Sequence, residues 1–184
     1  MKKYLIIAIL ILSMIPSSSH SSPFVLGGLQ TVEVKQSLIQ AGRWKMTPTV
    51  VVCQYSPATR DQVNSAISWW SSRGYSFHRT IFPGDRREHS ICNSPNPVGY
   101  ILIKLVTQDV LERLENNLAV THFYVDNDTN EVSWAKIYLT SHIENRVIEH
   151  EMGHSLGWMH TTEIGHLMNS KWIRGGWKDT GLHR

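Results

Sequence analysis

Three histidines and one glutamate stand at fixed spacing in residues 150–160, which read HEMGHSLGWMH. His150 and His154 are four positions apart, so on a helix their side chains lie one above the other on one face. Two imidazoles placed in this way can bind one metal ion. Glu151 lies about 100° round the helix from His150, where its carboxylate can reach a water molecule bound to that ion.

The third ligand must come from outside this helix, because a tryptophan occupies position 158, one turn after His154. Gly157 can adopt the positive φ that ends a helix and reverses the chain, and His160 can then return to the same ion. Three neutral imidazoles with one open coordination position are typical of catalytic zinc, whereas structural zinc has four protein ligands and favours cysteine. We therefore predict one catalytic Zn²⁺ held by the three histidines, with Glu151 as the catalytic residue.

His166 is a rival metal ligand, because it follows the motif closely in the sequence. A single histidine near a turn is more often a hydrogen-bonding or packing residue, and we expect that role for it. His142 is expected at the surface or at a helix start.

The N-terminal region has the pattern of a secretory signal peptide. Lys2 and Lys3 precede an almost unbroken apolar run over residues 4–15, and Pro16 and a group of serines follow. The run is too short for a comfortable membrane span. We expect residues 1–22 to be removed, which leaves a secreted protein, extracellular or periplasmic, without a stable membrane anchor.

The remaining chain is long enough for one domain with a sizeable core. Residues 23–48 lack clear periodicity and read as an N-terminal arm or a short pro-segment, and residues 49–184 read as the metal-binding domain. Without Lys2 and Lys3, the 18 basic residues fall to 16, against 15 acidic residues. This near-neutral balance gives no electrostatic reason to expect nucleic-acid binding, and we expect a monomer.

Two cysteines, Cys53 and Cys92, remain in the chain. In an oxidising compartment an even pair predicts one disulfide. A loop of about 40 residues closed in this way would gain about 4 kcal/mol in the chain-entropy model. The alternative is a pair of buried thiols.

Apolar patterns predict the elements that position the motif. We expect an α+β fold with a mixed, five-stranded twisted sheet and two long helices. The predicted strands cover residues 49–54, 75–82, 100–106, 121–125 and 132–139, and the predicted helices cover residues 59–73, a short stretch within 108–118, and the motif. An S-x-x-E capping box, Ser141 to Glu144, predicts that the motif helix begins at Ser141. Residues 83–97 are expected to form a loop.

Residues 126–130 read DNDTN and stand between two predicted strands. The D-x-D-x-N pattern occurs in calcium loops, but an EF-hand also needs Gly at its sixth position and Glu at its twelfth. Those positions hold Glu131 and Ile137. We predict a hairpin turn, with a Ca²⁺ site as the alternative.

The motif, together with a methionine shortly after it, resembles the signature of the metzincin zinc endopeptidases. Met168 lies eight residues after His160, and the small size is closest to matrixin-like members. The resemblance implies a metzincin-like (zincin) fold, with residues 49–184 as a zinc metallopeptidase domain and Met168 as an apolar floor under the histidines. Only 16 residues follow Met168, so the C-terminal subdomain must be very short.

The resemblance also implies a function, that of a zinc metalloendopeptidase, a hydrolase that cleaves a protein or peptide with zinc-activated water and a glutamate as general base. Residues 121–125, with Thr121, Phe123 and Val125, resemble the edge strand that pairs with an extended substrate. We expect the main substrate pocket between the motif helix and residues 169–177, with walls from Trp172 and Trp177. Two alternatives stay open: a zinc amidase that acts on cell-wall peptides, and a non-catalytic zinc-containing binding or inhibitory module.

Overall fold

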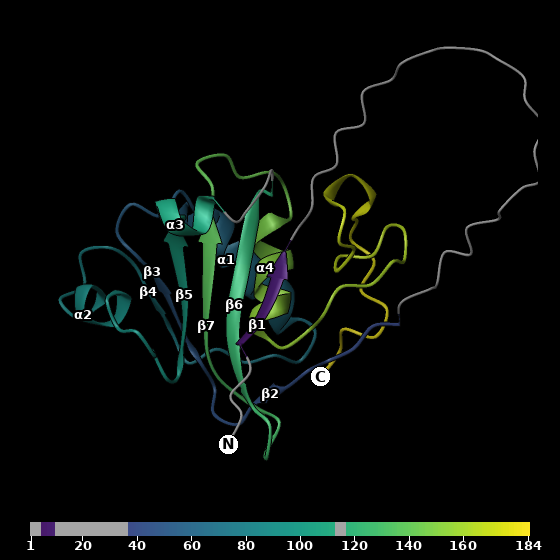
Figure 1. The fold of residues 1–184 in the computed structure, drawn as a ribbon, viewed down its shortest axis with the longest axis horizontal. Helices are drawn as coiled ribbons and strands as arrows, with labels where there is room; N and C mark the ends of the chain where they lie inside the picture. The colour runs from purple at the N-terminus through teal and green to yellow at the C-terminus, as the bar shows by residue number, and fades with distance from the viewer. Residues whose placement is uncertain (1–4, 10–36, 113–116) are drawn as a thin grey trace, which may run out of the picture.

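One mixed β-sheet runs through the molecule, with two helices side by side on one face (Figure 1). The computed structural model describes residues 5–9, 37–112 and 117–184. The strands are β1 (Leu5–Ile9), β2 (Arg43–Trp44), β3 (Thr49–Val52), β4 (Thr80–Ile81), β5 (Tyr100–Leu105), β6 (Ala119–Asp126) and β7 (Glu131–Leu139). The helices are α1 (Arg60–Ser71), α2 (Glu88–Cys92), α3 (Gln108–Leu111), α4 (Val147–Ser155) and a short 3₁₀ helix, η1 (Trp172–Arg174).

The strand order is β1-β6-β7-β5-β3-β4, and β2 pairs with the start of β7. Strands β4, β3, β5 and β7 are parallel, whereas β6 runs antiparallel to β7 and β1 antiparallel to β6. The expected α+β class and mixed sheet are confirmed. The sheet has seven strands rather than five, because β1 and β2 join the strands that the sequence predicted.

Side-chain alternation divides the sheet into two apolar faces. Val50 and Val52 belong to the main core with α1 and α4, and Val51 and Leu102 belong to a smaller cluster with the cysteines on the other face. The main core is completed by α1, which begins after Thr59 as predicted. The Thr59 and Gln62 side chains form a capping box there that satisfies the free N–H groups of the first turn.

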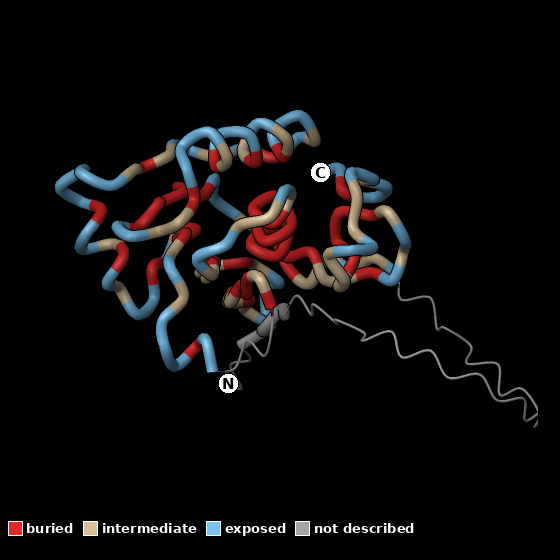
Figure 2. The backbone as a smooth tube through the Cα atoms, turned by 90° about the horizontal axis from the view of Figure 1, so that it is seen from above, coloured by how far each residue is buried: buried red, intermediate tan, exposed pale blue. Residues whose placement is uncertain are grey.

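Helix α4 carries the motif and is buried along its whole length (Figure 2). The prediction that it begins at Ser141 is wrong, because the helix begins at Val147. Glu144 accepts a hydrogen bond from His142 at 2.7 Å and is not used as a capping residue. Arg146 then adopts a left-handed conformation, with φ of 71°, which separates this loop from the helix. The motif helix is therefore short and held in place by packing.

Two further predictions about secondary structure are wrong. The predicted strand over residues 75–82 shrinks to Thr80–Ile81, because β3 is short and pairs with β4 only at Val50 and Val51. Tyr75 turns into the core instead and packs edge-on against Trp70. The predicted loop over residues 83–97 contains helix α2.

The turn between β6 and β7 is the predicted hairpin turn. Asp126 Oδ1 accepts the backbone N–H groups of Asp128 and Thr129 at 2.9 and 3.2 Å, and Asn130 takes a positive φ of 56°. This carboxylate oxygen therefore already stabilises the turn by accepting its backbone N–H groups. Among the described residues, no residue of this turn belongs to a group of three metal-ligating side chains, which a calcium site would require.

The N-terminal region is described only in part. The expected signal peptide, residues 1–22, lies outside the described residues except for Leu5–Ile9, which lies along β6 as β1. Of the expected arm, residues 37–48 are described; residues 39–41 lie against the chain after α4, and β2 pairs with β7. No helix in the described part of the chain has the length and hydropathy needed to cross a bilayer.

The disulfide between Cys53 and Cys92 is confirmed, and such a bond is consistent with an extracellular protein. Replacing both cysteines with serine should lower the free energy of unfolding by about 4 kcal/mol, because the bond closes a long loop in the unfolded chain. Urea unfolding of the double variant measures this loss. Equal midpoints for the variant and the unchanged protein would contradict the prediction.

Candidate metal centre

The imidazoles of His150, His154 and His160 converge on one point. His154 Nε2 lies 3.0 Å from the Nε2 atoms of both His150 and His160, and these two lie 3.3 Å apart. Two nitrogens on one zinc ion at ~2.0–2.1 Å and a tetrahedral angle would be separated by about 3.3 Å. The histidines are therefore placed as three ligands of one metal ion, as the spacing predicted.

Backbone carbonyls fix the orientation of two of these rings. His150 Nδ1 lies 2.7 Å from Leu167 O, and His154 Nδ1 lies 2.6 Å from Trp158 O. A carbonyl can only accept, so each Nδ1 must carry the proton and each Nε2 presents a lone pair. Lone pairs that face one another at this distance are placed to bind one cation between them.

Burial keeps these histidines neutral. It lowers the pKa of His150 to about 3 and that of His160 to about 4, and it holds the pKa of His154 well below its usual value. Neutral imidazole is the form that binds a metal ion. At pH 7 the site is therefore ready for a metal without the loss of a proton.

Glu151 lies fully buried beside the histidines. Thr121 Oγ1 donates a hydrogen bond to Oε2 of Glu151 at 2.5 Å, while Oε1 has no hydrogen-bond partner among the described residues. Burial raises the pKa of Glu151 to about 8, although the bond from Thr121 opposes this rise. A cation held by the histidines would favour the ionised carboxylate. The unpaired oxygen thus fits a site that contains a metal ion and its bound water.

Gly157 ends α4, as the sequence predicted. Its φ is +92°, and a Cβ atom at this position would overlap the carbonyl oxygen of Gly42. The Gly157 carbonyl accepts from Ala41 N–H, and Met159 N–H donates to Ile39 O, both at 2.8 Å. The chain that returns to His160 is therefore held like a strand against the N-terminal arm.

The same arm donates hydrogen bonds to carbonyl groups at the C-terminal end of α4 that have no partner within the helix. Trp44 Nε1 donates to Ser155 O at 2.8 Å, and Gln40 Nε2 donates to Leu156 O at 3.1 Å. Sequence reasoning missed this role, because residues 37–48 show no periodicity and side-chain capping from a distant segment leaves no local pattern.

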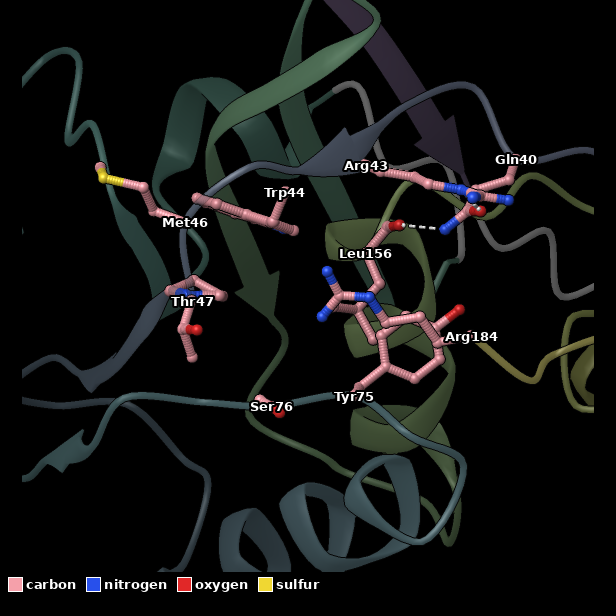
Figure 3. A pocket seen from close by; sticks show the side chains of 10 residues that line it. Gln40, Arg43, Trp44, Met46, Thr47, Tyr75, Ser76, Leu156 and Arg184 are labelled. Carbon is pink, nitrogen blue, oxygen red and sulfur yellow. Dashed lines mark hydrogen bonds between the residues drawn. The ribbon is translucent and has the colours of Figure 1, made fainter.

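A pocket opens beside this cap (Figure 3). Trp44, Tyr75 and Arg184 are among the residues that line it. It contains none of the three histidines and not Glu151. It is therefore separate from the candidate metal centre.

Met168 is fully buried and packs against α4 where Gly153 leaves room. A Cβ atom at Gly153 would overlap the Met168 sulfur atom, so only glycine permits this approach between His150 and His154. The preceding residue, Leu167, holds the His150 ring. Met168 therefore packs against the part of α4 that lies between His150 and His154.

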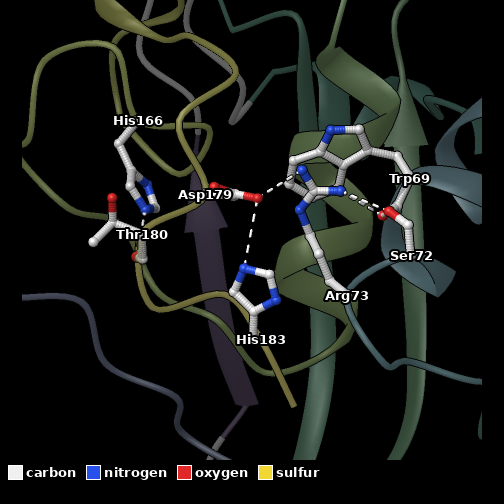
Figure 4. Close-up of polar contacts among 7 residues, drawn as sticks. All are labelled: Trp69, Ser72, Arg73, His166, Asp179, Thr180 and His183. Atoms are coloured by element: carbon white, nitrogen blue, oxygen red, sulfur yellow. Dashed lines mark hydrogen bonds and ion pairs between the residues drawn. The ribbon is translucent and has the colours of Figure 1, made fainter.

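His166 is a packing residue rather than a ligand, as expected. Its Nδ1 accepts from Met168 N–H at 3.0 Å and its Nε2 lies 3.1 Å from Thr180 O, so both ring nitrogens are used (Figure 4). Nearby, Asp179 binds Arg73 at 2.7 Å, and the Arg73 guanidinium lies 3.3 Å from the Trp69 ring. These contacts fasten the short C-terminal tail to the end of α1.

A small pocket lies between α4 and the tail, in the region where the sequence analysis expected the main substrate pocket. Arg146, His150 and Trp172 are among the residues that line it. Trp172 Nε1 donates to Asn145 O at 3.1 Å, which ties this wall to the loop before α4. Trp177 is not among the lining residues; it packs near Trp69, 6.1 Å between ring centres.

Strand β6 turns the side chains of Thr121, Phe123 and Val125 towards the core. Phe123 and Val125 are core residues, so only their backbone groups could meet a substrate. Thr121 contacts Glu151, a role that the predicted strand could not reveal, because it depends on how β6 lies over α4. The other edge of β6 pairs antiparallel with β1, Leu5 opposite Tyr124.

The protein should take up one Zn²⁺ per chain. His154→Gln should weaken zinc affinity by more than the roughly tenfold to hundredfold typical of outer-shell partners, because it removes a direct ligand. Metal analysis after gel filtration, with a chelator competition, measures both. His142→Gln, a matched change at an exposed histidine, should leave uptake unchanged; equal zinc content in the two variants would exclude the assigned ligand set.

Searches against protein-family models and against curated proteins find no match to this chain.

Proposed function

We propose that this protein is a secreted zinc-dependent endopeptidase of the metzincin type. One observation supports this most directly. Three imidazole Nε2 atoms converge beside a buried carboxylate whose Oε1 has no partner in the described structure. Such a set combines a metal site with a base that can reach a metal-bound water.

The donor set favours zinc. Three neutral imidazoles suit zinc, whereas calcium and magnesium take oxygen ligands. When bound at His150, His154 and His160, Zn²⁺ supplies a water of lowered pKa and polarises the scissile carbonyl.

Glu151 acts as the general base. Its free Oε1 takes the proton from the attacking water and passes it to the leaving amine. Thr121 holds the other oxygen, so the carboxylate cannot rotate freely within its buried site. Met168 beneath α4 and the carbonyl of Leu167 keep the histidines in position.

The sheet arrangement supports the same proposal. An antiparallel strand, β6, lies next to α4 and at the edge of the parallel part of the sheet. The pairing of β1 with β6 illustrates that an extended peptide fits along this edge. Removal of the leader would open the edge to a substrate.

Glu151→Gln should keep the zinc content and the thermal midpoint but lower turnover at least about 100-fold, because the amide cannot accept the proton. Cleavage of denatured casein, with and without a chelator, measures the loss. Peptidoglycan serves as a parallel substrate: its hydrolysis in place of casein would favour an amidase, and zinc binding without any hydrolysis would favour a non-catalytic module.

Thr121→Val should lower kcat by about tenfold with little change in KM, because a hydrogen bond to a charged group contributes roughly 1.5–3 kcal/mol. Thr121→Ser retains the hydroxyl and should stay close to the unchanged enzyme. Steady-state kinetics on one peptide compares the three proteins. A serine variant as slow as the valine variant would show that methyl packing, and not the hydrogen bond, is what matters.

A further inference from the structure

Tyr75 follows α1 in the chain and contacts the segment just after α4. Its backbone N–H donates to Trp70 O at 3.3 Å, and its ring packs edge-on against the Trp70 ring, with 5.2 Å between the ring centres. Tyr75 is buried, and burial raises the pKa of its hydroxyl group above the usual value. The hydroxyl group is therefore neutral at pH 7, and its oxygen can accept a hydrogen bond.

The Tyr75 hydroxyl group accepts a hydrogen bond from the side chain of Trp158. Trp158 Nε1 lies 2.8 Å from Tyr75 Oη, and both side chains are buried. A buried indole N–H group needs an acceptor from the protein, because it no longer contacts water. Tyr75 therefore fixes the position of the Trp158 ring.

The backbone of the same tryptophan holds one of the three histidines. Trp158 O lies 2.6 Å from Nδ1 of His154, and such outer-shell partners orient the ring of a metal ligand. We propose that Tyr75 is a positioning residue of the metal centre, which acts through Trp158 to set the ring orientation of His154. This inference rests on the metal site of the proposed enzyme, and on neither its substrate nor its reaction.

The turn after α4 offers few other side-chain contacts that could restrain this carbonyl group. Trp158 N–H donates to Gly153 O at 3.0 Å, and the N-terminal arm binds the neighbouring peptide groups. Gly157, directly before Trp158, has no side chain that could pack against the core. The indole ring is therefore the part of this turn that the core can hold, and Tyr75 is its hydrogen-bond partner.

The end of α1 contacts the metal-binding helix at two places, one near each of its histidines. Trp70 Nε1 donates to the carbonyl oxygen of Glu149 at 2.8 Å, one residue before His150. Tyr75 contacts Trp158, the residue whose carbonyl group orients His154. The stacked pair Trp70 and Tyr75 thus holds both ends of the segment that carries the two helical ligands.

Tyr75→Phe keeps the ring against Trp70 and removes the acceptor of the indole N–H group. In the metal-free protein, the Nδ1 proton of His154 can be followed by NMR and identified by its loss in His154→Gln. Its exchange with solvent should become about tenfold faster in Tyr75→Phe, as the loss of one hydrogen bond predicts. Tyr138→Phe, a matched change in a separate apolar cluster, should leave this signal unchanged.

Zinc affinity gives a second readout. In a chelator competition well below the thermal midpoint, Tyr75→Phe should bind Zn²⁺ about tenfold more weakly than the unchanged protein, at the lower end of the range for outer-shell partners. The folded protein alone is measured at that temperature, so a loss of stability by itself does not change the result. Tyr138→Phe should bind Zn²⁺ as tightly as the unchanged protein.

Trp158→Phe removes the same hydrogen bond from its other side. It should also weaken zinc binding, and the double variant with Tyr75→Phe should bind no more weakly than the weaker single variant, because both changes remove one interaction. Losses that add in the double variant, or an unchanged His154 signal in Tyr75→Phe, would overturn the inference. No peptide is cleaved in these experiments, so failure of the endopeptidase proposal would appear separately, as absence of hydrolysis by a zinc-loaded protein that shows these effects.

Discussion

The convergence of three buried imidazole rings on one point is the constraint on which the rest of the structure depends. The Nε2 atoms of the three histidines lie within 3.0–3.3 Å of one another, and two of them cannot carry a proton because carbonyl groups hold Nδ1–H on the opposite side of the ring. Such an arrangement needs a folded framework that enforces it, and it offers a site where one cation could be held. The burial of α4 on all sides, the close approach of Met168 and the fixed return of the chain to His160 form this framework.

Glu151 shows how the same framework prepares a reactive group. Removal of the carboxylate from water makes ionisation costly, and the Thr121 hydroxyl recovers part of that cost at one oxygen. The second oxygen has nothing within the described protein to bind. Such incomplete satisfaction is uncommon for buried polar atoms, and it is compatible with a bound ligand at this oxygen.

The sequence predicted the convergence of the three histidines, because their spacing follows directly from helix geometry. His150, His154 and Gly157 needed no information beyond the local chain. The start of α4 could not be predicted in this way, since the capping pattern at Ser141 matches many loops and Glu144 finds His142 instead. Likewise, Thr121 is one polar residue in an apolar strand, and its contact with Glu151 exists only once β6 lies over α4.

The arm formed by residues 37–44 also bears on how the protein could mature. Its side chains donate hydrogen bonds to the carbonyl groups of Ser155 and Leu156. Its backbone forms hydrogen bonds with Gly157 and Met159. A proteolytic cut within this arm would leave those carbonyl groups without partners and release the loop that carries His160. Any processing that yields a working protein must therefore cut upstream of the arm, which makes residues 37–44 part of the functional unit whatever precedes them.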